Sequence, residues 1–158
     1  MSTSAIPAIV DALYTTATAA LPGVSVYDGF GLSQDAATDT LMIGIDDPFT
    51  PNAVAAQTGN ATQATATLSP MRDRDQVGSV TCAAYAWNGD SDQKAARDAA
   101  FAIQAAIETA LRTDPQLGLG TTYRYLFCQL GDERLSQNLT DEGAEAALIF
   151  TVNFRVRL

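Results

Sequence analysis

The clearest pattern in the chain is an alternation of apolar and polar residues over its last thirteen positions, 146–158, AALIFTVNFRVRL. Every second residue from Leu148 to Leu158 is apolar, and Thr151, Asn153 and Arg155 stand between them. A period of two residues is typical of a strand with one buried face and one exposed face. The sequence therefore predicts a half-buried strand at this end of the chain.

Two segments carry apolar residues at helical spacing instead. In residues 5–20 the apolar positions recur every three or four residues, and Leu21-Pro22-Gly23 ends the pattern. An Ala-rich segment that begins at Asp90 or Ser91 and runs to Thr113 shows the same spacing, and a proline at position 115 stops it. We expect two helices, of which the second is the longer.

A short polar stretch precedes the second helix. An Asn88-Gly89 turn is followed by two acids, and Asp90 with Gln93 resembles a capping box. Asp92 suits the positive end of the helix dipole. We therefore interpret these acids as a turn and a helix cap, with Asp90 as the capping residue, and not as a catalytic corner beside Trp87.

The remaining segments predict the fold class. Apolar and β-branched runs predict four further strands, at 24–30, 40–46, 77–87 and 121–130. Residues 47–76 show no period and few large hydrophobic residues, which predicts a long extended loop or arm, and 131–145 reads as a polar connection. The order predicts a single α+β domain over residues 1–158, with a mostly antiparallel four- to five-stranded sheet and two helices packed on one face.

Charge and composition narrow the function. The chain has 18 acidic residues and nine basic ones, a formal net charge of -9. An acidic surface repels phosphate, which argues against sequence-specific binding of DNA or RNA. No run approaches the ~20 apolar residues of a membrane helix, and the N-terminus does not resemble a signal peptide. We expect a soluble protein without a membrane partner, made in the cytoplasm.

Residues for catalysis are scarce. The chain has no histidine, no nucleophile elbow, and no phosphate-binding or dinucleotide-binding motif. Its two cysteines, Cys82 and Cys128, lie in apolar runs and are expected to be buried thiols and not a disulfide. Acidic pairs stand where turns and caps are expected. We predict no catalytic residue, no cofactor and no metal site, and hence a protein that is not an enzyme.

One aromatic residue of the second helix is not explained by its core-facing side. Phe101 falls on the charged side of the helix, between Arg97 and Arg112. A loop of the same chain could cover Phe101, or it could be a singly exposed aromatic. Alternatively, it anchors another chain, because aromatic residues and arginine are enriched in the cores of interfaces. The sequence leaves both alternatives open.

Several stretches together resemble a known family. They are the passage from Tyr85 to Leu111, with Trp87, Gly89-Asp90 and Arg97; the sequence 114–118, DPQLG, after the helix; the first helix with Pro22-Gly23-Val24; and Gly143 before the final strand. Together they resemble the tail-terminator (tail-completion) proteins of long-tailed bacteriophages. The resemblance covers most of the chain and leaves residues 47–76 as its variable part.

The resemblance implies a structural role. Members of this family form rings, usually of six subunits, that cap the tail tube, stop its polymerisation and join the tail to the neck of the head. The expected partners are copies of the same chain, a tail-tube protein and a neck protein, at the tail–head junction of the virion. DNA passes through the ring without specific binding, and an acidic wall suits that passage.

The long loop gains a role from the same resemblance, as an arm that contacts a neighbouring subunit or the tube. The residues expected at these contacts are Phe101, Arg97 and Arg112 of the helix, with Pro48, Phe49, Arg72, Asp73, Arg74 and Asp75 of the loop. Other neck or tail-tube subunits would fit a similar sequence. A small-molecule-binding α+β domain or an enzyme is the alternative from another class.

Overall fold

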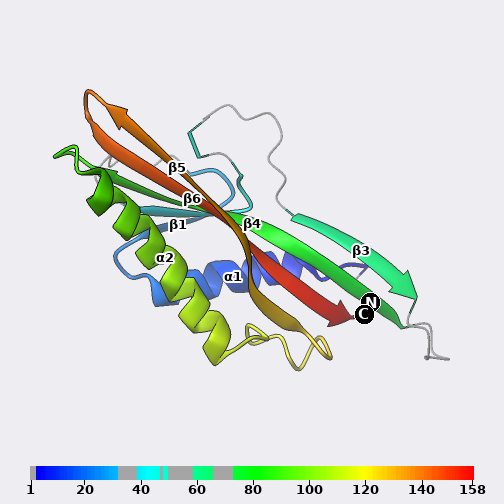
Figure 1. Ribbon diagram of the computed structural model, residues 1–158. Coiled ribbons are helices and arrows are strands. Elements are labelled where there is room, and N and C mark those ends of the chain that lie inside the picture. Colours follow the sequence, from blue (N-terminus) through cyan, green and yellow to red (C-terminus); the bar gives the residue numbers. More distant parts are fainter. Residues whose placement is uncertain (1–2, 32–38, 47, 50–58, 66–72) are drawn as a thin grey trace.

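The computed structural model describes residues 3–31, 39–46, 48–49, 59–65 and 73–158. The described part of the chain contains two helices and six strands (Figure 1). In chain order they are α1 (Ile6–Ala20), β1 (Ser25–Asp28), β2 (Thr40–Ile43), β3 (Gly59–Thr65), β4 (Arg74–Asn88), α2 (Gln93–Thr113), β5 (Phe127–Thr140) and β6 (Gly143–Arg157).

The six strands form one sheet, in which five follow the order β1-β2-β4-β6-β5 and β3 pairs with β4. Strand β4 is long enough to hold two neighbours on one side, β3 along its first half and β2 along its second half. All pairs are antiparallel except β1 with β2. The predicted α+β class with a mostly antiparallel sheet is confirmed, and the sheet has slightly more strands than the expected four to five.

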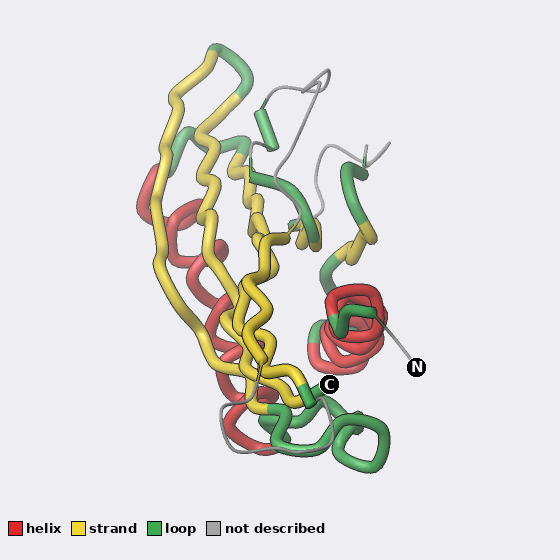
Figure 2. The backbone as a smooth tube through the Cα atoms, turned by 90° about the vertical axis from the view of Figure 1, so that its right-hand side faces the viewer, coloured by secondary structure: helices red, strands yellow, loops and turns green. Residues whose placement is uncertain are grey.

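The centre of the sheet is the antiparallel pair of β4 and β6. Their register runs without a break from Asp75 opposite Arg157 to Asn88 opposite Ala144. Figure 2 shows these strands and β5 running side by side along most of the molecule, with α2 alongside them and α1 seen end-on. Since residues opposite one another point to the same face, this register fixes which side chains of both strands face the helices.

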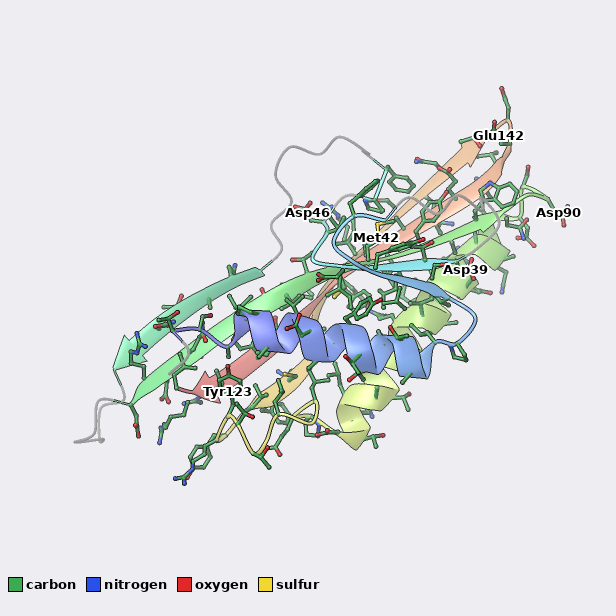
Figure 3. The ribbon with its side chains drawn as sticks, turned by 180° about the vertical axis from the view of Figure 1, so that it is seen from behind. Asp39, Met42, Asp46, Asp90, Tyr123 and Glu142 are labelled. Atoms are coloured by element: carbon green, nitrogen blue, oxygen red, sulfur yellow. The ribbon has the colours of Figure 1, made fainter. Side chains whose placement is uncertain are left out.

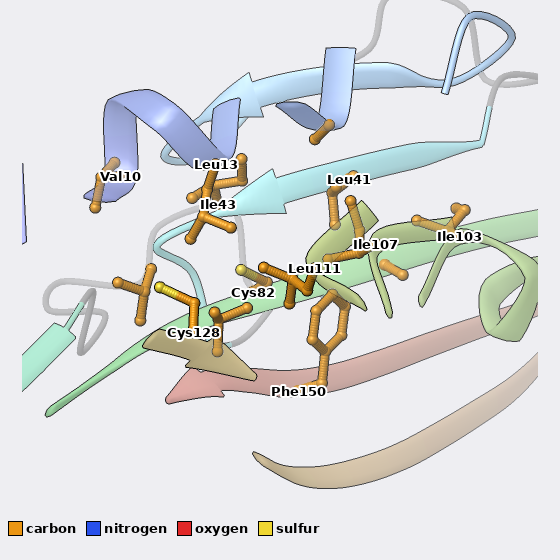
Figure 4. Packing of buried hydrophobic residues seen from close by; sticks show 14 of the residues in the cluster. Val10, Leu13, Leu41, Ile43, Cys82, Ile103, Ile107, Leu111, Cys128 and Phe150 are labelled. Atoms are coloured by element: carbon orange, nitrogen blue, oxygen red, sulfur yellow. The ribbon is translucent and has the colours of Figure 1, made fainter. Parts of the chain in front are cut away.

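The core lies between the helices and one face of the sheet. Cys82 of β4 lies opposite Phe150 of β6, and both side chains are buried. Ile107 of α2 and Leu13 of α1 belong to the same buried cluster (Figure 4). The predicted apolar side of the last strand is therefore confirmed as the buried side, because its even-numbered residues from Leu148 to Val156 are at most 2% exposed.

Gln76 attaches the start of α1 to the sheet. This residue of β4 is only 1% exposed. Its Oε1 accepts a hydrogen bond from the Ala5 backbone N–H at 2.8 Å, and its Nε2 donates to the Ser4 hydroxyl at 2.8 Å. One buried amide thus satisfies a free N–H at the beginning of a helix, where no intrahelical partner exists.

The start of α2 differs from the prediction. The capping residue is Asp92, whose Oδ1 accepts from the Ala95 N–H at 3.1 Å, and the helix begins at Gln93. The preceding turn is held by Asn88, whose Oδ1 accepts from the backbone N–H of Asp90. Asp90 was expected to cap the helix, and this expectation was wrong because the polar turn occupies two more residues than the sequence indicated.

The strand predicted at 121–130 was placed too early. Residues 121–126 form turns, and β5 begins at Phe127 and continues through Thr140, so the polar connection expected at 131–145 is mostly strand. A shift of register between Leu130 and Glu133 interrupts the alternation of β5. Such a bulge moves the later residues out of phase with the earlier ones, which hides a period of two in the sequence.

The loop predicted at 47–76 is also partly wrong. Gly59–Thr65 is strand β3, paired antiparallel with β4 from Val80 to Arg74, and β4 itself already begins at Arg74. Positions 47, 50–58 and 66–72 of the expected arm lie outside the described residues. Strand β3 has small and polar side chains on both faces, so its state depends on the partner strand and not on its own hydrophobic pattern.

A matched pair of leucines tests where the core lies. Leu148 of β6 is 0% exposed and Leu139 of β5 is 60% exposed. Leu148→Ala should lower the free energy of unfolding by about 2–5 kcal/mol, because it leaves a cavity in a close-packed core. Leu139→Ala should change it by less than about 1 kcal/mol. Urea denaturation followed by circular dichroism measures both, and equal losses would contradict this assignment of the core.

A second matched pair tests the helix cap. Asp92→Ala removes the side chain that accepts from the Ala95 N–H and should cost about 1 kcal/mol of stability. Asp90→Ala removes a carboxylate two residues earlier and should cost clearly less. Both variants are compared by thermal and urea unfolding. A larger loss for Asp90→Ala would restore the capping box that the sequence suggested.

Candidate assembly surfaces

The face of the sheet opposite the helices is buried around Ala83 and Ala147 and is exposed towards the start of β4. Near β2, the ring of Phe49 packs edge-on against Tyr85, with ring centroids 6.0 Å apart and an interplanar angle of 78°. Towards the other end of β4, Val77 is 53% exposed, and so is Phe127 of β5, at 51%; both residues pair with Arg155 of the intervening β6. We call the region around Val77, Phe127 and Arg155 the open sheet face; it forms a shallow hollow between β3 and β5.

An ion-pair cluster borders the open sheet face. The Arg157 Nε donates to Asp75 Oδ1 at 2.9 Å, and the guanidinium of Arg155 lies 3.7 Å from Asp75 Oδ2. The hydrogen bond from Arg157 lowers the pKa of the Asp75 carboxyl, with a smaller contribution from Arg155. The two arginines share one carboxylate, and the Arg155 side chain stays 70% exposed.

Tyr125 stands out from the surface next to this cluster. It is 72% exposed, and the guanidinium carbon of Arg157 lies 5.4 Å from the centre of its ring, a cation–π distance. Its φ angle is +59°, in the left-handed region that bulky residues seldom adopt. The turn before β5 therefore holds an aromatic ring in solvent at a cost in backbone strain, which is typical of residues kept for contacts.

The backbone gathers further arginines at the same end of the sheet. Arg74 and Leu158 exchange two backbone hydrogen bonds, of 2.8 and 3.2 Å, and the Arg157 N–H donates to the Arg124 carbonyl at 3.3 Å. Arg74 also donates to Gln63 of β3. We call the set Arg74, Arg124, Tyr125, Arg155 and Arg157 the arginine end.

The helix candidates are placed differently from what a helical wheel suggests. Phe101 is partly buried and packs against the core cluster. Arg97 lies 3.8 Å from Asp98, and Arg112 pairs with Glu108 at 2.6 Å one helical turn away. The Arg112–Glu108 pair is of the i,i+4 type that stabilises a helix modestly, and it needs no partner chain.

The loop candidates are only partly brought together. Arg74 and Asp75 lie at the arginine end, and the Asp75 carboxylate is engaged by arginines of its own chain. Phe49 contacts Tyr85, and Pro48 is half-buried beside it in the chain. Asp73 is half-buried next to this cluster in the chain, and Arg72 lies outside the described residues.

The described residues hold no group of three or more acidic or cysteine side chains that could bind a metal ion. Cys82 and Cys128 are buried free thiols, and burial raises the pKa of each to about 12, which makes them poor nucleophiles. No helix within the described ranges is long and apolar enough to span a membrane.

Sequence reasoning missed most of the arginine end. Arg155 and Arg157 were assigned to the exposed side of the last strand, but nothing local pairs them with Asp75, which is 82 positions away from Arg157. Tyr125 and Phe127 were read as residues of a strand, with no signal that they would be exposed. The alternation of β6 was the one pattern that could have found part of this surface.

The chain was compared with known proteins. No protein-family model matches it, and no curated protein matches it. Among solved structures, its fold is similar to a chain from a structure described as the virion of a native gene transfer agent particle, with a TM-score of 0.55 and 15% sequence identity. The match covers 99% of this chain and 100% of that chain.

The Asp75–Arg157 pair predicts a pH dependence of stability. Because the folded state lowers the pKa of Asp75 below 3.8, the pair contributes stability that is fully present above that value. The contribution is lost as the pH falls through the lowered folded pKa. In Asp75→Asn, stability should therefore fall less steeply below about pH 4 than in the wild type. Urea midpoints between pH 2 and 7 measure this.

The control for this variant is Asp11→Asn, on an exposed position of α1, since Asp11 makes no ion pair within the described residues. Identical pH profiles for Asp75→Asn and the wild type would show that the ion pair does not contribute.

Proposed function

We propose that the chain is a structural subunit of a phage-like particle. The observation that carries this proposal is the fold similarity to a chain from a gene transfer agent virion, which spans both chains almost from end to end. A match of that extent involves the whole domain and not a common substructure. In this proposal the protein acts by contacting other subunits and is not an enzyme.

The surface supports such a role. Arginine and aromatic residues are enriched in the cores of protein interfaces, and the arginine end adjoins the exposed Phe127 and Val77. Each of these large side chains stays in solvent although the chain has a well-formed core elsewhere. Exposed apolar area that is bordered by arginines is typical of a contact surface.

Within the virion we propose the role of a tail terminator, a ring of six copies that caps the tail tube, stops its growth and joins the tail to the neck. The sequence stretches that resemble this family support the role, and they include α1, the end of β4, most of α2 and the start of β6. The net charge of -9 is compatible with a ring through which DNA passes without binding. The virion would then hold the protein at the tail–head junction.

The purified protein tests this role directly. A terminator should form closed rings of about six times the 16.6 kDa of one chain, and the rings should not grow as the protein concentration rises. Mass photometry and negative-stain electron microscopy measure size and shape. Tubes of increasing length would instead assign the chain to the tail tube, and a protein that stays monomeric at every concentration would contradict ring formation.

A functional readout separates a terminator from another neck subunit. When the protein is added to the tail-tube protein of the same particle during its polymerisation, tubes should be shorter and should carry one ring at an end. Tubes of unchanged length without end rings would contradict the terminator role even where rings form. Bovine serum albumin at the same concentration controls for crowding.

A further inference from the structure

The charges of this acidic chain are segregated along the sheet. Four of its nine basic residues lie at the arginine end, where the formal charges of Asp73 and Asp75 offset only half of them. At the opposite end of β4 and β6 lie four exposed acids, and the nearest basic residue in the chain, Lys94, is already paired with Asp98; the four acids are Asp90, Asp92, Asp141 and Glu142. We call these four residues the acidic end (Figure 3 labels two of them, with Tyr123 at the far end).

The acidic end is one surface built from two turns. The β5–β6 turn carries Asp141 and Glu142, and the turn before α2 carries Asp90. The two turns touch at Gly143, where a Cβ atom would collide with the Asn88 carbonyl oxygen. The acids of both turns therefore lie side by side, and Figure 3 shows Asp90 and Glu142 at the same tip of the molecule.

The two ends are far apart. The β4–β6 register places Arg157 opposite Asp75 at one end and Ala144 opposite Asn88 at the other. Gly143 and Arg157 are the two ends of the 15-residue strand β6, which corresponds to a separation of roughly 45 Å at about 3.3 Å per residue. At that distance the charges of the two ends cannot neutralise one another within one molecule, because salt screens them beyond about 8–10 Å.

We propose that the arginine end of one copy of this chain docks onto the acidic end of the next copy. This inference rests on the proposed ring, and it names the surfaces that form the contact. Arg124 and Arg155 face Asp141 and Glu142 of the neighbouring copy across it, and Tyr125 supplies the apolar contact. The Asp75–Arg157 ion pair stays within its own subunit and fixes the position of the Arg157 guanidinium beside Tyr125.

Charge complementarity identifies the occupant as a second copy. Chains with a net charge of -9 repel one another, so a contact between copies is favoured only where a positive surface meets a negative one. The contact uses two different surfaces of the same chain, and such head-to-tail contacts close into rings when the rotation permits. A ring built in this way leaves no arginine end and no acidic end unpaired.

The composition of the arginine end also suits a protein partner. Tyr125 is 72% exposed and already stacked by Arg157, so little side-chain freedom remains for binding to remove. Arg124 is exposed, and the Arg155 side chain is 70% exposed and only loosely paired. Arginine and tyrosine in this arrangement are the residue types that dominate binding energy at interfaces.

Two charge-reversal variants test the contact. The first, Arg124→Glu with Arg155→Glu, makes both ends of the molecule acidic. The second, Asp90→Arg with Asp141→Arg and Glu142→Arg, makes both ends basic and leaves the Asp92 cap intact. Each variant alone should need at least a tenfold higher protein concentration for half-assembly, as measured by mass photometry and sedimentation velocity at low salt. Circular dichroism and thermal unfolding confirm that each variant is folded.

Mixing the two variants gives the sharpest result. An equimolar mixture should assemble at a concentration within about threefold of the wild type, because each altered end then meets an oppositely charged end of the other variant. Arg134→Glu, in the middle of β5 and at neither end, is the matched single-reversal control and should assemble like the wild type. Raising the salt concentration should weaken assembly of the wild type and of the mixture alike.

The possible failures are distinguishable. If the wild type remains monomeric at every concentration, the ring and this contact are both overturned. If the wild type forms rings and the two variants do so equally well, only the contact is overturned. If the first variant assembles normally but no longer retains a short DNA duplex in a gel-shift assay, the arginine end binds phosphate and the proposal is wrong.

Discussion

The uninterrupted register of β4 with β6 is the constraint on which the rest of the structure depends. It sets Asp75 opposite Arg157 at one end and Asn88 opposite Ala144 at the other. Between them, each pair of opposed residues points to one face, so a slip of one position would turn Phe150 and Cys82 away from the helices. The core, the attachment of α1 through Gln76, and the separation of the charged ends all follow from this pairing.

The same alternation of buried and exposed positions gives the two faces of the sheet different roles. Apolar residues of both strands on one face are covered by α1 and α2, which provides the stability of the fold. The other face has no such cover near Val77 and Phe127, and there the chain keeps large side chains in solvent. A domain stabilised from one side can present the other side to neighbours without weakening its core. This arrangement suits a subunit whose role depends on contact.

The sequence predicted those elements whose patterns are local. The last strand and both helices were found because each carries its own period, and Cys82 and Cys128 were expected to be buried because they lie in apolar runs. Strand β3 was missed because it is polar on both faces and is defined by its pairing with β4. The later half of β5 was missed because a bulge breaks its period. In both cases a distant partner determines the structure.

The candidate surfaces follow the same rule. A helical wheel of α2 places Phe101 among charged residues, because the wheel omits the elements that pack on the helix. In the structure β5 runs beside α2, and the Gln104 amide of α2 donates a hydrogen bond to Glu133 of β5. In the folded chain Phe101 packs against the core, which gives it a role within the subunit. The sequence did not indicate that Arg155 and Tyr125 share a surface, because they belong to segments 30 residues apart that meet only in the folded sheet. An interface of this kind consists of side chains that the fold leaves exposed. It can be recognised only when the structure shows which other side chains are buried in the core.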